Sequence, residues 1–283
     1  MQFPELSYAN PDDPALKRGL IRLIERAAGR DYFAPIYQRW RSETLPRHDH
    51  AVIRPMLDLI GVELQVIARA WPIAIAPGQP LVIIANHPYG ILDGIAALAL
   101  AEDLGRPFRV LINMELLKVP ELEPYSLPID FRETPEALQR NLATRNEAVR
   151  LLRDGTTIVV FPAGGVATAR RPFGAAQELA WKPFTARMVQ AARASVLPVY
   201  FEGQCGPLFH IASRISMTLR LSLLIREFRR SVGGRLVARI GDVVPFADLR
   251  HGDDRRALLA ELYQRVHALS PAAGDFPAGG RPS

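Results

Sequence analysis

Apolar and polar positions alternate along most of this 283-residue chain in blocks that predict strands separated by helices. Short apolar runs bounded by proline, glycine or polar residues are typical of buried strands, and apolar residues three or four apart indicate amphipathic helices. Strands are therefore expected at 62–75, with an interruption at Pro72, and at 81–85, 109–112, 156–161, 196–201 and 236–240. Helices are expected at 94–104, 134–154, 176–194, 213–231 and 254–269. This alternation predicts an α/β fold with a mixed, largely parallel sheet flanked by helices.

The first 60 residues follow a different pattern, which predicts an N-terminal helical appendage of two basic amphipathic helices. Asp13-Pro14 and Gly29 are typical start and stop signals for the first helix, and the second is expected at 31–43. Their apolar positions are Leu16, Leu20, Leu23, Ile24 and Ala27, and then Tyr32, Phe33, Tyr37 and Trp40. Such helices either pack on the protein with a solvated charged face or lie in a membrane interface. The expected organisation is an appendage at 1–60, an α/β domain at 61–269 and a disordered Pro/Gly-rich tail at 270–283.

The segment 213–231 raises the same choice between packing and membrane contact. Its apolar stripe contains Met217, Leu221, Leu224, Ile225 and Phe228, and its basic side contains Arg220, Arg226, Arg229 and Arg230. Such a helix covers a sheet with a basic outer face, or it sets that face against anionic lipid, or it does both.

Composition narrows the classes of partner. Lys and Arg number 35 against 29 Asp and Glu, which leaves a net charge of +6 and favours anionic partners such as phospholipid head groups. Nucleic acid is disfavoured, because the basic residues interleave with apolar helical positions and no nucleic-acid-binding motif is present. A single cysteine, Cys205, excludes an internal disulfide framework. The N-terminus lacks the pattern of a secretory signal, and no apolar run approaches the ~18 residues of a membrane span, so membrane contact is expected to be peripheral.

The most informative stretch is NHPYGILDG, which follows the apolar run at 81–85. It presents His87 and Asp93, an imidazole that accepts protons near neutral pH and a carboxylate that can orient it. A structural alternative also fits, in which His87 is a capping or core histidine and Asp93 is the N-cap of the helix at 94–104. The residues of this stretch alone leave both interpretations open.

Other candidate chemistry is weaker. Gly164-Gly165 offers backbone N–H groups for an oxyanion, although paired glycines usually indicate only a tight turn. The pair His48 and His50 lacks a third ligand, so no metal site is expected. The Gly-x-Ser-x-Gly elbow of covalent serine hydrolases is absent from the sequence, and Cys205 is expected to be inert.

Four ordered blocks within about residues 10–250 resemble the glycerolipid acyltransferases that act on lysophosphatidic acid and other lysolipids, and more narrowly their bacterial hemolysin-like branch. The blocks are NHPYGILDG, INMELLKVPELEPYSLPIDF, VVFPAGGVAT and VLPVYFEG. The resemblance implies the fold of glycerol-3-phosphate and lysophosphatidate acyltransferases. It also implies a peripheral enzyme at the cytoplasmic face of the inner membrane, with an acyl carrier protein or coenzyme A thioester as co-substrate, a lysolipid acceptor and no cofactor or metal.

The same resemblance implies individual roles. His87 is the general base and Asp93 its orienting partner. The implied substrate-binding residues are Asn86, Asn113, Glu115, Phe161, Pro162, Gly164, Gly165, Arg170 and Arg171. With the substrate hydroxyl in place of serine, the His–Asp pair would work by the logic of a catalytic triad.

The chain departs from the family pattern at several of these positions. Five residues separate His87 from Asp93 where the wider family has four, although the longer spacing is usual in the hemolysin-like branch. Ala163 stands where the wider family has Glu, and Gly165-Val166 where it has Thr-Arg. Asn113 stands where many members have Lys, and Phe131 where they have Arg. Two alternatives therefore remain, which are O-acylation of a lyso-ornithine or lyso-glycine aminolipid and a catalytically weak lipid-binding protein.

Overall fold

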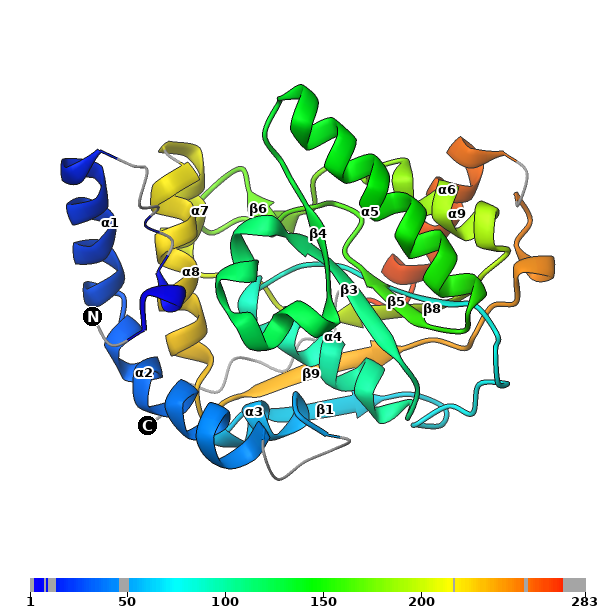
Figure 1. The fold of residues 1–283 in the computed structure, drawn as a ribbon, viewed down its shortest axis with the longest axis horizontal. Coiled ribbons are helices and arrows are strands. Elements are labelled where there is room, and N and C mark those ends of the chain that lie inside the picture. Colours follow the sequence, from blue (N-terminus) through cyan, green and yellow to red (C-terminus); the bar gives the residue numbers. More distant parts are fainter. Residues whose placement is uncertain are drawn as a thin grey trace.

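The computed structural model describes residues 3–7, 9, 14–45, 51–215, 217–251 and 254–271. Over these residues a seven-stranded sheet, in the order β1-β9-β8-β2-β5-β3-β4, crosses the centre of the molecule (Figure 1). Its strands are β1 (Glu63–Ile67), β2 (Leu81–Ala85), β3 (Phe108–Asn113), β4 (Ser126–Ile129), β5 (Thr157–Val160), β8 (Ser195–Phe201) and β9 (Arg235–Ile240). A separate antiparallel hairpin contains β6 (Thr168–Ala169) and β7 (Ala176–Gln177).

Neighbouring strands of the large sheet are parallel except for the antiparallel pair β8 and β9. The central strands β2 and β5 are buried at every position, which suits their continuous apolar and β-branched sequences. Because β2, β5 and β8 are mutually parallel, their carboxyl ends meet at one edge of the sheet, where sites in α/β folds gather. The predicted α/β class with a mixed, largely parallel sheet is confirmed.

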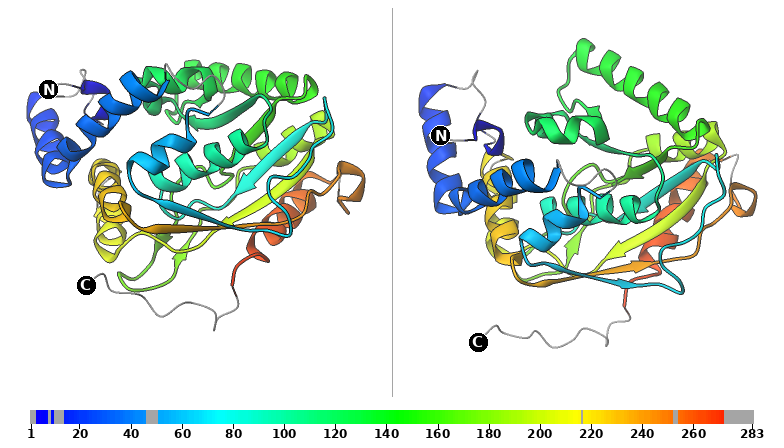
Figure 2. Two further views of the ribbon diagram at one scale, coloured as in Figure 1. Left: turned by 90° about the horizontal axis from the view of Figure 1, so that it is seen from below. Right: turned by 60° about the horizontal axis from the view of Figure 1, so that its bottom comes forward.

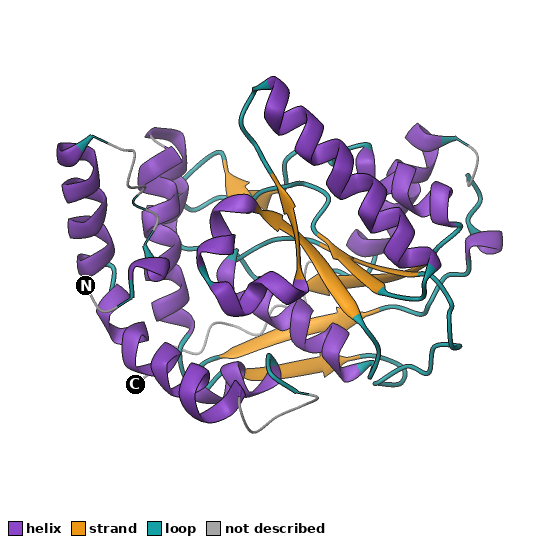
Figure 3. Ribbon diagram, in the orientation of Figure 1, coloured by secondary structure: helices purple, strands orange, loops and turns teal. Residues whose placement is uncertain are grey.

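Helices cover both faces of the sheet (Figures 2 and 3). Alternate side chains of β2 point to opposite faces, so Leu81 and Ile83 join one apolar cluster, and Val82 and Ile84 join the other. The first cluster includes side chains of α3 (Arg54–Leu59), α4 (Ile91–Asp103) and α8 (Met217–Ser231). The second includes side chains of α5 (Pro135–Arg153), α6 (Phe184–Ala192) and α9 (Arg255–His267). The remaining elements are α7 (Pro207–Ile215), which packs on α8, and the short helical turns η1 (Pro4–Leu6), η4 (Met114–Lys118), η5 (Pro120–Tyr125) and η6 (Phe246–Asp248).

The two N-terminal helices are present and lie beside α8 (Figure 1). They are α1 (Ala15–Ala27) and α2 (Arg30–Arg39), the latter continued by the π-helical turn η2 (Trp40–Thr44). Most of the expected apolar stripe of α1 is not buried, since Leu16, Leu20 and Leu23 are 91%, 58% and 65% exposed, whereas Ile21, outside that stripe, is buried. No helix within the described residues is long and apolar enough to cross a membrane.

Two expected elements have wrong boundaries at prolines. The strand expected at 62–75 ends at Ile67, and residues 68–75, which include Pro72, form no strand. The helix expected at 176–194 begins only at Phe184, directly after Pro183, and its first residues pair instead as β7. Helix α3, strand β4 and the β6–β7 hairpin were not predicted from the sequence.

Two helix predictions need a further correction. The helix expected at 94–104 begins at Ile91, so Gly90 rather than Asp93 is its N-cap, and Asp93 lies in the first turn. The single helix expected at 213–231 is two helices, α7 and α8. On α8 the basic side is partly covered, since the Arg229 guanidinium lies 3.3 Å from the ring centroid of Tyr32.

Candidate functional site

His87 and Asp93 meet at the carboxyl end of β2, where the chain turns into α4. His87 Nδ1 and Asp93 Oδ1 are 3.3 Å apart. The Asp93 side chain is completely buried, whereas the imidazole is 17% exposed. The pair therefore has a buried carboxylate behind a ring whose other side reaches solvent.

The two facing atoms have only each other as partners within the described residues. Nδ1 and Oδ1 are buried and make no hydrogen bond of good geometry there, although they are close enough for an ion pair. The other carboxylate oxygen, Oδ2, accepts the backbone N–H of Tyr89 at 3.0 Å. A buried carboxylate oxygen without a donor is costly, so the pair is complete only when a protonated Nδ1 donates to Oδ1. This places the hydrogen on Nδ1 and leaves Nε2 as the acceptor.

Asn86 holds the loop to the neighbouring strand. Its side-chain N–H donates to Phe201 O at 2.9 Å, and its carbonyl accepts Phe201 N–H at 2.7 Å. Both polar ends of the buried amide are thus occupied at the end of β8. The observed contacts of Asn86 position His87, and its substrate-binding role stays a prediction.

The third sequence block, after β5, lies against His87. The Phe161 ring stacks on the imidazole with centroids 4.2 Å apart, and Ala167 N–H donates to His87 O at 2.8 Å. Gly90 makes this approach possible, because it has φ +85° and a Cβ there would lie 2.9 Å from Val166 Cγ2. The loops after β2 and β5 are therefore packed together around the imidazole.

The paired glycines differ in their hydrogen bonding. Gly164 has φ +68°, and its N–H donates to Phe161 O at 2.9 Å, which closes a tight turn. For the Gly165 N–H, no acceptor is found in the part of the chain that the structure describes. Gly165 is therefore the better candidate of the two for an oxyanion donor.

The other predicted binding residues surround the pair less closely. Pro162 is buried and its carbonyl accepts Lys182 N–H, and Asn113 ends β3. Arg170 and Arg171 are exposed beside the β6–β7 hairpin. Glu115 lies in η4, but its side chain is outside what the structure describes.

Two residues near His87 were missed or misplaced by the sequence analysis. Glu178 accepts the His87 backbone N–H at 3.1 Å, and no pattern around it in the sequence marks it. Arg220 was placed on the outer face of its helix, yet its Nη2 donates to Val166 O at 2.6 Å. Burial lowers the pKa of Arg220, and no carboxylate among the described residues pairs with it.

The other titratable groups nearby are poor candidates for the base or the nucleophile. Burial raises the pKa of Tyr89 to about 12, and burial also raises the pKa of the Cys205 thiol. Both groups therefore stay protonated near neutral pH. The described residues contain no cluster of three or more His, Cys, Asp or Glu that could hold a metal, and His48 and His50 lie outside them.

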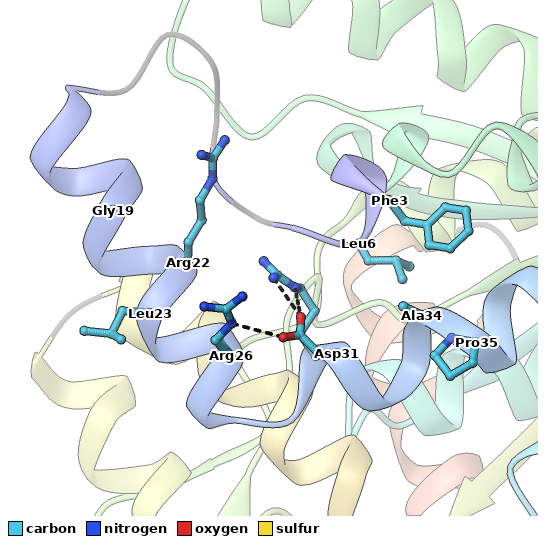
Figure 4. A pocket seen from close by; sticks show the side chains of 10 residues that line it. Phe3, Leu6, Gly19, Arg22, Leu23, Arg26, Asp31, Ala34 and Pro35 are labelled. Carbon is cyan, nitrogen blue, oxygen red and sulfur yellow. Dashed lines mark hydrogen bonds and ion pairs between the residues drawn. The ribbon is translucent and has the colours of Figure 1, made fainter. Parts of the chain in front are cut away.

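A separate pocket of about 600 Å³ lies between α1 and α2 (Figure 4). Arg22, Arg26 and Arg30 line it together with Phe3 and Leu6. Arg30 Nη2 forms an ion pair with Asp31 Oδ1 at 2.9 Å, and Arg26 Nε forms one with Asp31 Oδ2 at 3.1 Å. Hydrogen bonds from these two guanidinium groups hold the pKa of the Asp31 carboxyl below its usual value. None of the predicted catalytic residues lines this pocket, so available volume does not mark the His–Asp pair.

Comparison with known proteins identified one family model and a similar solved structure. A protein-family model described as "Acyltransferase" matches residues 63–254. Among solved structures, the crystal structure of the 1-acyl-sn-glycerophosphate (LPA) acyltransferase PlsC from Thermotoga maritima is similar, with 13% sequence identity and a TM-score of 0.48. The match covers 89% of this chain and 97% of that chain. No curated protein matches.

Proposed function

This chain belongs to the acyltransferase family, and on that premise we propose that it moves a fatty acyl group from a thioester to the hydroxyl of a lysophospholipid-type acceptor. The acyl donor is acyl carrier protein or coenzyme A, and the reaction invokes no metal or cofactor. One observation carries the proposal, which is the 3.3 Å approach of His87 Nδ1 to the fully buried Asp93 at the carboxyl end of β2.

His87 acts as the general base. The acceptor hydroxyl attacks the thioester carbonyl while Nε2 takes its proton, and Asp93 orients the ring and stabilises the imidazolium. When the tetrahedral intermediate collapses, the C–S bond breaks and the imidazolium returns the proton to the leaving thiolate. The products are the acylated lipid and the free thiol, and His87 is neutral again.

Two surroundings of the pair support this chemistry. The Phe161 ring covers one face of the imidazole, which limits its rotation and keeps Nδ1 toward Asp93. The Gly165 N–H, which has no acceptor among the described residues, is offered to the oxyanion, a contribution worth ~10²–10³-fold for one well-placed donor. Asn86 and Ala167 hold the backbone on which the pair depends.

The proposed site of action is the cytoplasmic face of an inner membrane, reached from the surface. Leu16, Leu20 and Leu23 are exposed on α1, and Arg22 and Arg26 lie among them. Apolar and basic side chains on one exposed helix suit the interface of an anionic bilayer, where each basic residue contributes about 1 kcal/mol.

The testing experiment is transfer of a labelled acyl group by the purified protein. Acyl carrier protein and coenzyme A thioesters are each offered with a panel of lysophospholipids, lyso-ornithine lipid and lyso-glycine lipid. We expect an O-acylated diacyl product with at least one lysophospholipid. If product forms only from an aminolipid, the aminolipid alternative is favoured. If none of the donor–acceptor pairs gives a product, the proposal is contradicted.

A further inference from the structure

A second carboxylate, from a distant part of the chain, also holds His87. The Glu178 side chain is only 4% exposed. Its Oε1 accepts the backbone N–H of His87 at 3.1 Å. Its Oε2 accepts the indole N–H of Trp181 at 3.0 Å and lies 3.0 Å from His267 Nε2. Because a carboxylate only accepts, this contact places a hydrogen on His267 Nε2.

His267, which Glu178 contacts through Oε2, is held in place by the packing of α9. His267 ends α9, next to Val266, which is completely buried. Its ring packs against Tyr263 with centroids 4.1 Å apart, and against Tyr200 at 5.8 Å. Glu178 therefore connects the loop after β2 to a helix packed against the opposite side of the sheet from α4.

The segment 161–178 fixes His87 at three points. The Phe161 ring stacks on the imidazole, Ala167 N–H donates to the main-chain carbonyl, and Glu178 accepts the main-chain N–H. The direction of the imidazole relative to Asp93 thus depends on how this segment is seated. Glu178 is the point at which the segment is itself tied to Trp181 and α9.

We propose that Glu178 is a positioning residue for His87, which fixes the main chain so that the imidazole faces both Asp93 and the acceptor hydroxyl. The proposal rests on the proposed function of His87 as the base. Glu178 does not touch the substrate, and it acts through the His87 N–H.

The arrangement makes a specific demand on residue 178. Both oxygens of Glu178 accept hydrogen bonds, one from His87 and the other from Trp181. A glutamine has one accepting end and one donating end. In the wild-type surroundings, Glu178→Gln must therefore set an N–H against an N–H at one of the two ends.

The first test is steady-state kinetics of Glu178→Gln with whichever thioester and lysolipid the wild type uses. We expect kcat to fall by about 10²-fold, the scale of a small misplacement of a catalytic group, with KM within about twofold. Glu261→Gln is the matched control, since Glu261 is also buried and each of its oxygens also accepts a backbone N–H, from Arg250 and His251, beside its pairing with Arg265 and away from His87. A rise in KM with unchanged kcat, or an equal loss in the control, would overturn the proposal.

The same substitution made in a Trp181→Phe protein distinguishes a positioning role of Glu178 from a role in packing alone. In Trp181→Phe the indole donor is gone, so the amide that Glu178→Gln introduces can turn its N–H toward His267, whose Nε2 accepts once the ring hydrogen moves to Nδ1, and keep its oxygen for His87. We expect Glu178→Gln to cost at least tenfold less kcat in this background than in the wild type. An equal cost in both backgrounds would count against the proposal.

A measurement that does not depend on enzymatic activity tests this proposal separately from the proposed function. Amide hydrogen exchange at His87, measured by NMR, should be accelerated at least tenfold in Glu178→Gln and unchanged in Glu261→Gln. Unchanged exchange and unchanged kcat in an active enzyme would overturn the role of Glu178. A wild type that transfers no acyl group while the exchange behaves as expected would instead overturn the proposed function.

Discussion

His87 and Asp93 bring together two buried polar atoms that have no other partner within the described residues, whereas the charged groups of the pocket between α1 and α2 are mostly paired. In that pocket Arg26 and Arg30 are both bonded to Asp31. The pocket offers about 600 Å³ of open volume, yet most of its charged groups are already paired with one another. The comparison teaches that incomplete hydrogen bonding at a strand end is a better mark of chemistry here than available space.

The largest expected difference between the two regions concerns their aspartates. Asp93→Asn should lower kcat by ~10²–10⁴-fold, because an amide can offer its N–H to Nδ1 and favour the wrong tautomer of His87. Asp31→Asn should leave kcat unchanged. Steady-state rates of both variants, with circular dichroism as a check on folding, test this difference. Equal kcat values would remove the distinction between the regions.

The glycines of the two regions should respond to a methyl group with opposite signs. Gly90→Ala adds a Cβ at φ +85° and close to Val166 and Leu224, so we expect a loss of about 1–3 kcal/mol of unfolding free energy. Gly19 lies within α1, where a Cβ would meet no described atom within 4 Å, so Gly19→Ala should stabilise by about 0.5–1 kcal/mol. Denaturant titration of both variants measures the two changes in unfolding free energy. Changes of the same sign in the two variants would contradict this account.

Membrane contact is expected to separate the regions next. The double variant Leu16→Glu/Leu20→Glu should weaken binding to anionic vesicles by about tenfold or more, since it replaces exposed apolar groups of α1 with charges. Its kcat on detergent-dispersed substrate should stay at the wild-type value. Ile67→Glu, at an exposed apolar position of β1, is the control. Co-sedimentation with vesicles measures binding, and equal loss in the control would show that α1 has no special part in it.

The smallest expected effect is the pH dependence of the Asp31 ion pairs. Hydrogen bonds from Arg30 and then Arg26 lower the pKa of Asp31 in the folded state below its usual 3.8. A lowered folded-state pKa stabilises the protein above the unfolded pKa, and this contribution is lost as the pH falls through the folded value. Because the side chain is 55% exposed, at most about 0.5 kcal/mol is expected. The difference in melting temperature between wild type and Asp31→Asn should therefore be present at pH 7 and shrink below about pH 4.

Much of the sheet could be predicted, because its strands are short apolar runs with clear ends. The run at 81–85 and the helix at 134–154, which Thr134 caps, were found within a residue or two of their observed ends. The boundaries that failed are set by tertiary contacts. Of the residues before Pro183, Ala176 and Gln177 form a strand of the hairpin, and Glu178 accepts the backbone N–H of His87. No apolar periodicity in this part of the sequence indicates either feature.

The candidate site divides in the same way. His87 and Asp93 could be predicted because they are close in sequence and follow a recognisable strand. Glu178 and Arg220 could not, since each reaches the loops around His87 from elements far along the chain. The choice between packing and membrane contact for α1 could not be made from the sequence, because the buried face of that helix contains Glu25, which accepts from Ser7 and Arg30, and three of its leucines are exposed.

The central claim is that His87 is the base of an acyl transfer, and the rate of His87→Ala tests it most directly. Wild type, His87→Ala and the surface control His251→Ala are compared for transfer from a labelled thioester to the preferred lysolipid. The account predicts that kcat of His87→Ala falls by at least ~10²-fold while His251→Ala and the melting temperatures stay near the wild-type values. Transfer by His87→Ala at the wild-type rate would contradict it.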